Sequence, residues 1–337
     1  MVSEFNQEKA LALLDEIRIH RATTGGTFTS LCGSKGSGKT NYMLVLAQQM
    51  VFIHPLSGLP MKETILWRGR EIDYWNYFFE PDFEWEDESL KREVFIHVHT
   101  GDEIEFKDEF KKPLNLDGRV LKYDSAPTLY RNLVQGEINV IYEPLNYQMS
   151  PAVIDIITAK ACMKREYLQK VEMDPPLFWF ELVAFLMKAK GAGFLTIIMD
   201  EADEVFPMNP QGLRWHLQEW FKDKTRDLRK NNISFLFSMH AWNDIDYRIS
   251  SKIMYKMWMK GAIPPPSSFV KKEKGIPRTL FLPVGYIIVE RDGYGDFKVR
   301  KLKERPRVKV NYLNQSGVDW DRWVPETESG EESRAYG

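Results

Sequence analysis

The sequence predicts an α/β fold in which helices cover both faces of a mostly parallel β-sheet. Apolar, strand-like runs alternate along the chain with segments whose apolar residues recur every three or four positions, the spacing of an amphipathic helix. An early strand leads directly into a glycine-rich loop, and a later buried strand ends in two carboxylates. Between these two signals we expect strands at 63–68, 94–99 and 138–142 and helices at 128–134, 151–170 and 176–190.

The glycine-rich loop follows an apolar run at 28–32 and fits the pattern G-x-x-x-x-G-K-[ST], the phosphate-binding P-loop. Glycines allow backbone N–H groups to turn around a polyphosphate, and the following helix directs its positive dipole end at the same charge. That helix is predicted from the spacing of Tyr42, Met43, Leu46 and Met50. We expect the loop to bind ATP through Gly33, Ser34, Lys35, Gly36, Ser37, Gly38, Lys39, Thr40 and Asn41.

Two side chains of this loop have expected roles in chemistry. Lys39 would reach the β- and γ-phosphates, and the hydroxyl of Thr40 would bind Mg²⁺. No other metal is expected, because no cysteine and histidine cluster has the spacing of a zinc site. His97 and His99 lie two apart on a predicted strand without a third ligand nearby, so we predict that they lie on the solvated face of an edge strand.

The second functional signal is a buried strand at 193–199 that ends in Asp200 and Glu201. An apolar strand with this ending is typical of the Walker B strand of a P-loop ATPase. Asp200 is predicted to hold Mg²⁺, and Glu201 is predicted to polarise the attacking water. The letters from 200 to 203 also spell D-E-A-D, the signature of a class of RNA helicases. We favour the ATPase, because that class needs a second RecA-like domain and fewer than 140 residues follow the motif.

The next predicted strand, 233–238, leads to His240. A polar residue at the tip of the strand beside Walker B can contact the γ-phosphate, so His240 is a candidate sensor; a helix-capping or core histidine is the alternative. The basic run before this strand contains Arg229 and Arg226, which are candidate arginine fingers for the γ-phosphate of a neighbouring subunit. A solvated helix face that pairs these arginines with nearby acids is the alternative hypothesis.

The stretch 194–260 resembles the FtsK–HerA superfamily of DNA-pumping ATPases and the related Zot-like proteins of viruses and plasmids. The resemblance rests on the Asp200–Glu201 strand end, the helix after it, Arg229 before a turn, and an apolar strand that ends in a polar residue. In that superfamily the arginine before the turn is the finger and the strand-end residue, usually Gln, is the sensor. Arg229 and His240 match these positions, with His in place of the usual Gln.

This resemblance implies a RecA-like P-loop NTPase core and a homo-oligomer, expected to be a hexameric ring that acts on DNA. The implied activity is Mg²⁺-dependent ATP hydrolysis coupled to DNA translocation or packaging, in the cytoplasm of a host cell if the protein is viral. A Zot-like assembly or secretion ATPase, with a capsid or secretion-complex protein as its partner, is the alternative. The two hypotheses differ in whether DNA raises the ATPase rate.

The segments outside this core are predicted to be additions to it. Residues 70–125, rich in aromatic and acidic side chains, are expected to form a small insertion in an ATPase domain that spans 23–310. A C-terminal β-hairpin is predicted at 284–301 from its glycine-rich turn, and the polar tail at 311–337 is expected to be partly disordered. A basic stripe, which is a candidate phosphate-backbone contact or a solvated edge strand, comprises Lys298, Arg300, Lys301, Lys303, Arg305, Arg307 and Lys309.

Composition excludes several classes of protein. At 337 residues, 43% hydrophobic and 28% charged, the chain can bury a full core as one large domain or two small ones. Two cysteines cannot form a disulfide framework, and a formal net charge of -2 argues against a uniformly basic coat for nucleic acid. Residues 1–22 are predicted as an amphipathic helix, because charges interrupt the apolar region that a signal peptide needs. No membrane span is expected.

Overall fold

The computed structural model describes residues 25–53, 58–79, 91–148, 150–151, 153–155, 174–189, 193–270, 272–273, 275–290, 294–298 and 307–314. The predicted helix 1–22, most of the predicted helix 151–170, the stripe residues from 300 to 305 and the tail from 315 lie outside this part of the chain.

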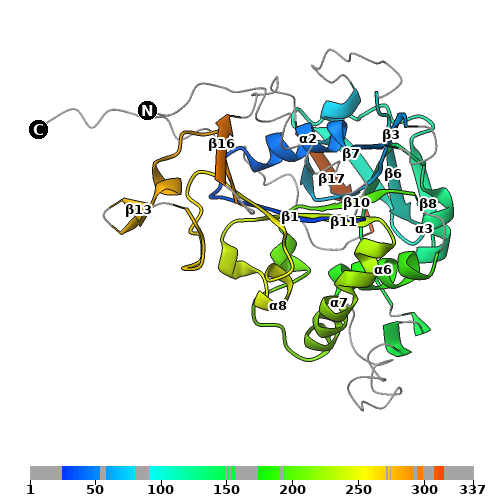
Figure 1. Ribbon diagram of the computed structural model, residues 1–337. Coiled ribbons are helices and arrows are strands. Elements are labelled where there is room, and N and C mark those ends of the chain that lie inside the picture. Colours follow the sequence, from blue (N-terminus) through cyan, green and yellow to red (C-terminus); the bar gives the residue numbers. More distant parts are fainter. Residues whose placement is uncertain are drawn as a thin grey trace, which may run out of the picture.

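A ten-stranded sheet runs through the centre of the protein, in the order β16-β15-β12-β1-β11-β10-β4-β9-β6-β8 (Figure 1). Every pair from β12 to β8 is parallel, and only β15 and β16 are antiparallel, so the predicted mostly parallel sheet is confirmed. Its strands are β1 Phe28–Cys32, β4 Thr64–Arg68, β6 Val94–His99, β8 Val120–Tyr123, β9 Ile138–Ile141, β10 Leu195–Met199, β11 Ile233–Met239, β12 Tyr255–Trp258, β15 Tyr286–Glu290 and β16 Tyr294–Lys298.

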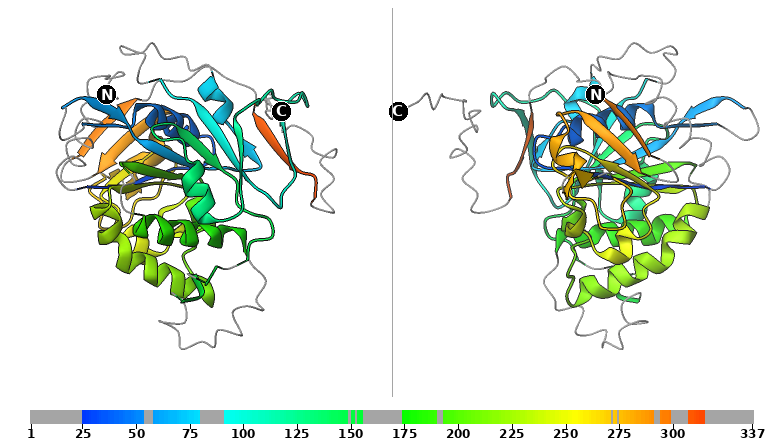
Figure 2. Two further views of the ribbon diagram at one scale, coloured as in Figure 1. Left: turned by 90° about the vertical axis from the view of Figure 1, so that its right-hand side faces the viewer. Right: turned by 60° about the vertical axis from the view of Figure 1, so that its left-hand side comes forward.

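Helices cover both faces of this sheet. On one face lies α2, Lys39–Gln49; on the other lie α3, Ala126–Asn132, α6, Phe178–Lys188, and α7, Leu213–Lys230 (Figures 1 and 2). Side chains alternate between the two faces along each strand, so that Ile197 belongs to the core under α6 and α7 while Ile198 belongs to the core under α2. The central strands are therefore buried on both sides, which explains why they are continuous apolar runs in the sequence.

The segment predicted as an insertion contributes to the main sheet. Its strands β6 and β8 follow β9 at one end of the sheet, and its short helix η1, Trp75–Phe79, packs on the same face as α2. Because β6 pairs with both β9 and β8, the prediction that it is a solvated edge strand is wrong. His97 is fully buried there, and its Nε2 lies 2.9 Å from Oδ1 of Asn139.

A second sheet has three strands, β5 Ile72–Asp73, β17 Val308–Tyr312 and β7 Ile104–Asp108, in that order. The predicted hairpin is present as β15 and β16, but β17 does not continue its second arm. Lys298 and Lys309 consequently belong to different sheets, and the basic stripe is not one continuous strand. The remaining short elements are β2 Val51–Ile53, β3 Pro60–Lys62, β13 Lys272–Glu273, β14 Ile276–Pro277, η3 Pro175–Leu177, η4 Ala202–Glu204, η5 Trp242–Asp244, α8 Tyr247–Ser250 and η6 Arg278–Phe281.

One buried arginine joins several of these elements. Arg92 is only 2% exposed, and its guanidinium donates to four backbone carbonyl oxygens. Two of these belong to Gln48 and Met50 at the end of α2, one to Glu63 before β4 and one to Gly136 before β9. Arg92 thus connects the segment before β6 to the helix that follows the P-loop. None of the helices in the described part of the chain has the length and apolar character needed to cross a membrane.

Candidate functional site

The P-loop connects the end of β1 to the start of α2, as the motif predicts. Gly36 and Gly38 have φ angles of 75° and 98°, which a residue with a Cβ atom rarely adopts, so glycine is required by the turn itself. No side chain caps α2 at Gly38, which leaves the positive end of an 11-residue helix directed at the loop. The buried hydroxyl of Ser37 has no hydrogen-bond partner among the described residues. These features fit a polyphosphate.

Neighbouring strand ends hold the loop in place. The N–H of Gly33 donates to the carbonyl of Met239 at the end of β11, 3.2 Å away, and the N–H of Ser34 donates to the carbonyl of Lys260 after β12, 2.9 Å away. Ser37 accepts from the N–H of Gly285 at 3.2 Å. The loop is therefore fixed from three sides by segments more than 200 residues away in the sequence.

Lys39 reaches back across the loop. Its Nζ donates to the carbonyls of Gly33 and Ser34, 2.6 and 3.2 Å away, and the residue is only 8% exposed. Burial lowers the pKa of Lys39, and the negative charge of Asp200 opposes that shift. The ammonium group is held where a bound triphosphate would replace the two carbonyls as its partner.

The Asp200–Glu201 pair follows β10 at the same edge of the sheet. Glu201 has a φ angle of 48°, a left-handed conformation that costs a residue with a Cβ atom about 1 kcal/mol. The N–H of Glu201 donates to Oδ1 of Asp200 at 3.1 Å. Burial raises the pKa of Glu201, and the nearby guanidinium of Arg70 opposes the shift.

His240 lies between the P-loop lysine and the acidic pair. Its Nδ1 is 3.2 Å from Nζ of Lys39, and its Nε2 is 4.0 Å from Oε1 of Glu201. This proximity arises because β11 lies between β1 and β10, so three parallel strands end side by side. The structure thus brings together Lys39, Glu201 and His240, which are far apart in the sequence.

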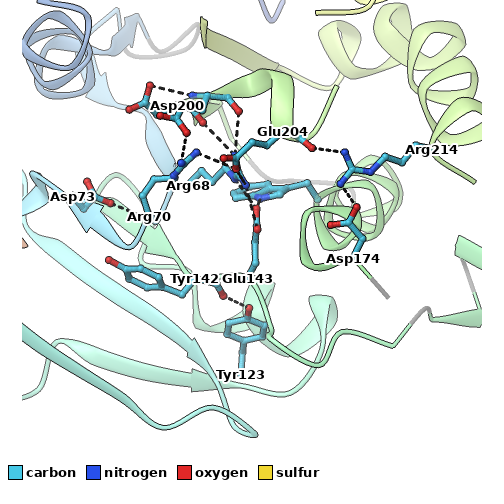
Figure 3. A network of polar contacts seen from close by, with 12 residues as sticks. Arg68, Arg70, Asp73, Tyr123, Tyr142, Glu143, Asp174, Asp200, Glu204 and Arg214 are labelled. Carbon is cyan, nitrogen blue, oxygen red and sulfur yellow. Dashed lines mark hydrogen bonds and ion pairs between the residues drawn. The ribbon is translucent and has the colours of Figure 1, made fainter. Parts of the chain in front are cut away.

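Two arginines that the sequence analysis missed complete the polar network (Figure 3). Arg68, at the end of β4, donates to the carbonyls of Asp200 and Glu201 at 3.3 and 3.2 Å, and its side chain is only 3% exposed. Its Nε pairs with Oε1 of Glu143 at 2.6 Å, and one terminal nitrogen pairs with Glu204 at 2.7 Å. Arg70 pairs with Glu201 and, at 3.0 Å, with Glu204.

A signal for these arginines was present in the sequence. Arg68 is the last residue of a buried strand and Arg70 follows it after Gly69, at the edge of a parallel sheet where polar side chains collect. What the sequence could not supply was that β4 is the neighbour of β10, which is the fact that brings Arg70 to Glu201.

Thr40 and Asp200 provide oxygen atoms suited to Mg²⁺. The negative charge of Asp200 acts to raise the pKa of Lys39 in the loop. Among the residues described, no three cysteine, histidine or acidic side chains gather as a metal site. Mg²⁺ in nucleotide sites is held by one or two protein oxygens together with phosphates and water, so these two residues fit the ion as part of a nucleotide complex.

Arg229 lies at the opposite edge of the sheet from the P-loop. Its Nε donates to the carbonyl of Gly26 at 3.1 Å, and the N–H of Gly26 donates back to the Arg229 carbonyl at 2.8 Å. Gly26 precedes β1 and Gly33 follows it, so seven residues of extended chain, roughly 20 Å at 3.3 Å per residue, separate the two ends. Asp227, one of the acids near Arg229 in the sequence, pairs with Lys224 at 3.5 Å. Arg226 is exposed.

The order of the strands identifies the fold. A P-loop follows β1, a carboxylate pair follows β10, and β11 lies between these two strands in a parallel sheet with helices on both faces. The chain has a RecA-like P-loop NTPase fold. The fold class predicted from the sequence is confirmed.

Several solved structures are similar to this chain. No protein-family model matches the chain, and no curated protein matches it in sequence. Among solved structures, it is similar to the genome packaging NTPase B204 from Sulfolobus turreted icosahedral virus 2 in complex with AMPPCP, with 12% identity and a TM-score of 0.39 over 81% of this chain and 97% of that one.

Two further solved structures are similar. One is the N-terminal domain of zonular occludens toxin from Neisseria meningitidis, with 8% identity and a TM-score of 0.32 over 82% of this chain and 86% of that one. The other is the pCW3 conjugation coupling protein TcpA, monomer form with ATPgS, with 11% identity and a TM-score of 0.34 over 82% of this chain and 60% of that one. The resemblance of the stretch 194–260 to the FtsK–HerA superfamily stays a prediction from the sequence.

Proposed function

We propose that this protein is a Mg²⁺-dependent ATPase that couples ATP hydrolysis to translocation or packaging of DNA, working as a ring of identical subunits. The observation that supports hydrolysis is the convergence of Lys39, Glu201 and His240 where β1, β10 and β11 end side by side. The choice of DNA as the substrate is supported by the sequence resemblance of 194–260 to FtsK–HerA ATPases.

Each residue has a role in this proposal. Lys39 contacts the β- and γ-phosphates, and Thr40 and Asp200 hold Mg²⁺, which neutralises phosphate charge when it is bound. Glu201 orients and polarises a water molecule. The water oxygen forms a bond to the γ-phosphorus while the bond from that phosphorus to the β–γ bridging oxygen breaks. ADP leaves with the bridging oxygen. One water proton passes by way of Glu201 to the newly formed inorganic phosphate, which keeps the other proton.

His240 lies within reach of both Lys39 and Glu201, which supports its role as the sensor of the γ-phosphate. A ring is proposed because Arg229 lies at the far edge of the sheet from the nucleotide loop. A finger in that position can serve only the nucleotide of another subunit.

The test is ATP hydrolysis by the full chain with and without DNA, with Lys39→Ala as the background measurement. We expect Mg²⁺-dependent hydrolysis that rises when duplex or single-stranded DNA is added. Absence of hydrolysis above the Lys39→Ala background under all conditions would contradict the ATPase assignment. Hydrolysis that ignores DNA, together with no DNA binding at low salt, would reject DNA as the substrate and favour an assembly or secretion ATPase.

A further inference from the structure

The connection between β12 and β15, residues 259–285, exposes large apolar side chains. Of the fifteen exposed ones in the described part of the chain, six lie here, and the most exposed of these, Phe269, is 73% exposed. We call these six the apolar patch: Ile263, Phe269, Ile276, Leu280, Phe281 and Val284. In Figure 1 the connection projects at the left of the main sheet, where β13 is labelled. A concentration of exposed apolar side chains on a folded protein marks a surface that binds a partner.

The fold itself turns these side chains outward. Ala262, Val270 and Leu282 of the connection are buried in the core that also contains residues of α6 and α7. Each of the three is adjacent in the sequence to a residue of the apolar patch. The two arms of the connection are also joined, because the hydroxyl of Thr279 donates to the carbonyl of Ala262 at 2.5 Å. The patch is thus held outward by an anchored backbone.

The connection is also basic, although the whole chain has a formal net charge of -2. It holds one acidic residue, Glu273, and five basic ones, two of which, Lys271 and Lys274, lie outside the described residues. Lys260 and Lys272 are exposed. Exposed apolar groups among basic ones are typical of surfaces that lie on anionic membranes. The apolar groups enter the boundary between headgroups and acyl chains, while Lys and Arg attract the negative headgroups.

We propose that the β12–β15 connection docks on the surface of a lipid bilayer that contains anionic lipids. Phe281 and Val284 enter the apolar boundary, and the exposed lysines face the headgroup phosphates. This contact is peripheral and needs no membrane-spanning helix. It lies next to the proposed nucleotide site, because the N–H of Gly285 donates to the carbonyl of Ser37 in the P-loop at 3.2 Å.

Two other partners fit the connection less well. A DNA duplex offers phosphates to the basic side chains but no apolar layer to the patch. A second copy of the chain, docked as the proposed ring requires, would bring the end of α7 with Arg229 toward the P-loop and so toward the connection. That end is basic too, with five basic and two acidic residues at 222–230, so like charges would meet.

The experiment is flotation of the full chain, without nucleotide, with vesicles of phosphatidylcholine alone or mixed with phosphatidylglycerol. We expect binding to the anionic vesicles only, weakened by salt. Phe281→Ser combined with Val284→Ser should weaken this binding by about tenfold or more, because two large side chains no longer enter the apolar boundary. Lys272→Gln should weaken it by about fivefold. The matched control, Leu59→Ser with Met61→Ser, changes two exposed apolar residues at β3 and should bind as the parent does.

A fluorescent label tests the orientation on the membrane. An environment-sensitive fluorophore on Val284→Cys should shift its emission to the blue on anionic vesicles, whereas the same fluorophore on Leu59→Cys should not. Both labelled variants carry Cys162→Ser, and the other cysteine, Cys32, is buried. Should the double serine variant fail to fold, the label decides, because an unchanged emission from position 284 overturns the inference.

Other outcomes also overturn it. One is failure of the parent protein to bind anionic vesicles at low salt, and another is an equal loss of binding in the patch and control variants. If the parent stays unbound and Phe281→Ser with Val284→Ser lowers its oligomeric mass or its affinity for DNA, the patch binds another copy or DNA instead. None of these outcomes bears on the proposed ATPase activity, because no nucleotide is present.

Discussion

Lys39 and Glu201 lie at the same edge of the sheet and are proposed to have different roles, which single substitutions should separate. Lys39→Ala removes the buried ammonium that would neutralise the β- and γ-phosphates, so ATP affinity and hydrolysis should both be lost. Glu201→Gln keeps the size of the side chain but not its charge. It should bind ATP with the parental affinity and slow hydrolysis by a factor of about 10² or more. Equilibrium binding of a fluorescent ATP analogue and steady-state hydrolysis measure the two effects.

The control for these substitutions is Lys224→Ala on α7, which removes a surface lysine that pairs with Asp227 at 3.5 Å. It should change neither binding nor hydrolysis. Parental hydrolysis by Glu201→Gln would show that another group polarises the water. Parental ATP affinity in Lys39→Ala would remove the P-loop from the proposed site.

The residues that could be predicted from the sequence are those whose chemistry is contained in a short continuous motif. The P-loop is one such motif, and the strand end at Asp200 and Glu201 is another. Arg70 could not be predicted, because its partner lies 131 residues away and meets it only through the pairing of β4 with β10. The proximity of His240 to Lys39 was expected only in part, since a strand tip near the γ-phosphate does not specify which side chains it contacts.

Among the elements, the connection made by Arg92 should matter most for stability. Arg92→Met keeps the length and apolar stem of the side chain but removes the donor from the carbonyls of Gln48, Glu63 and Gly136, while the carbonyl of Met50 keeps the N–H of Glu63 at 3.1 Å. A buried acceptor without a partner costs about 1–3 kcal/mol, so the free energy of unfolding should fall by about 3 kcal/mol or more. Urea unfolding followed by circular dichroism measures it.

Arg119→Met provides the comparison for this prediction, because within the described part of the chain Arg119 donates to a single carbonyl, that of Val94, at 3.2 Å. The free energy of unfolding of Arg119→Met should be no more than about 1 kcal/mol below that of the parent protein. If the two variants lose equal free energy of unfolding, the contacts of Arg92 stabilise the fold no more than those of the partly buried Arg119.

The elements themselves were predicted well where their pattern was local. Five predicted strands are observed at their expected positions, each in an apolar run of the sequence. They are β4, β6, β9, β10 and β11. The place of β6 in the sheet was not predicted, because a strand's sequence records that its faces are buried but not which strands flank it. The separation of β17 from the hairpin was missed for the same reason. β17 pairs with β7 and β5, which lie far away in the sequence, so no local pattern records this pairing.

For the whole molecule, the proposed ring predicts that two inactive variants restore each other. Arg229→Ala should bind ATP normally and hydrolyse it poorly, because a finger in trans can contribute a factor of about 10³ or more in rate. Mixing it with Lys39→Ala subunits creates junctions in which an intact Arg229 faces an intact P-loop. Hydrolysis by the mixture should then exceed that of either variant alone.

The mixing experiment needs evidence that the subunits exchange, which two different affinity tags and a pull-down supply. Arg226→Ala tests the neighbouring exposed arginine in the same way. If Arg229→Ala hydrolyses ATP at the parental rate, its hydrogen bond to Gly26 is structural and the finger lies elsewhere. Mixtures that co-assemble and stay inactive would lead to the same conclusion.

The position of β1 in the sheet also affects how the protein is made. Both neighbours of β1 are synthesised late, since Phe28 pairs with Phe235 and Thr29 with Tyr255. At a ribosomal speed of about 5–20 residues per second, this apolar strand waits roughly 10–40 s for its partners. During that time the nascent chain exposes an unpaired strand that can aggregate. The strand that leads into the P-loop is thus translated more than 200 residues before either of its neighbours, and it is paired on both sides only after both have left the ribosome.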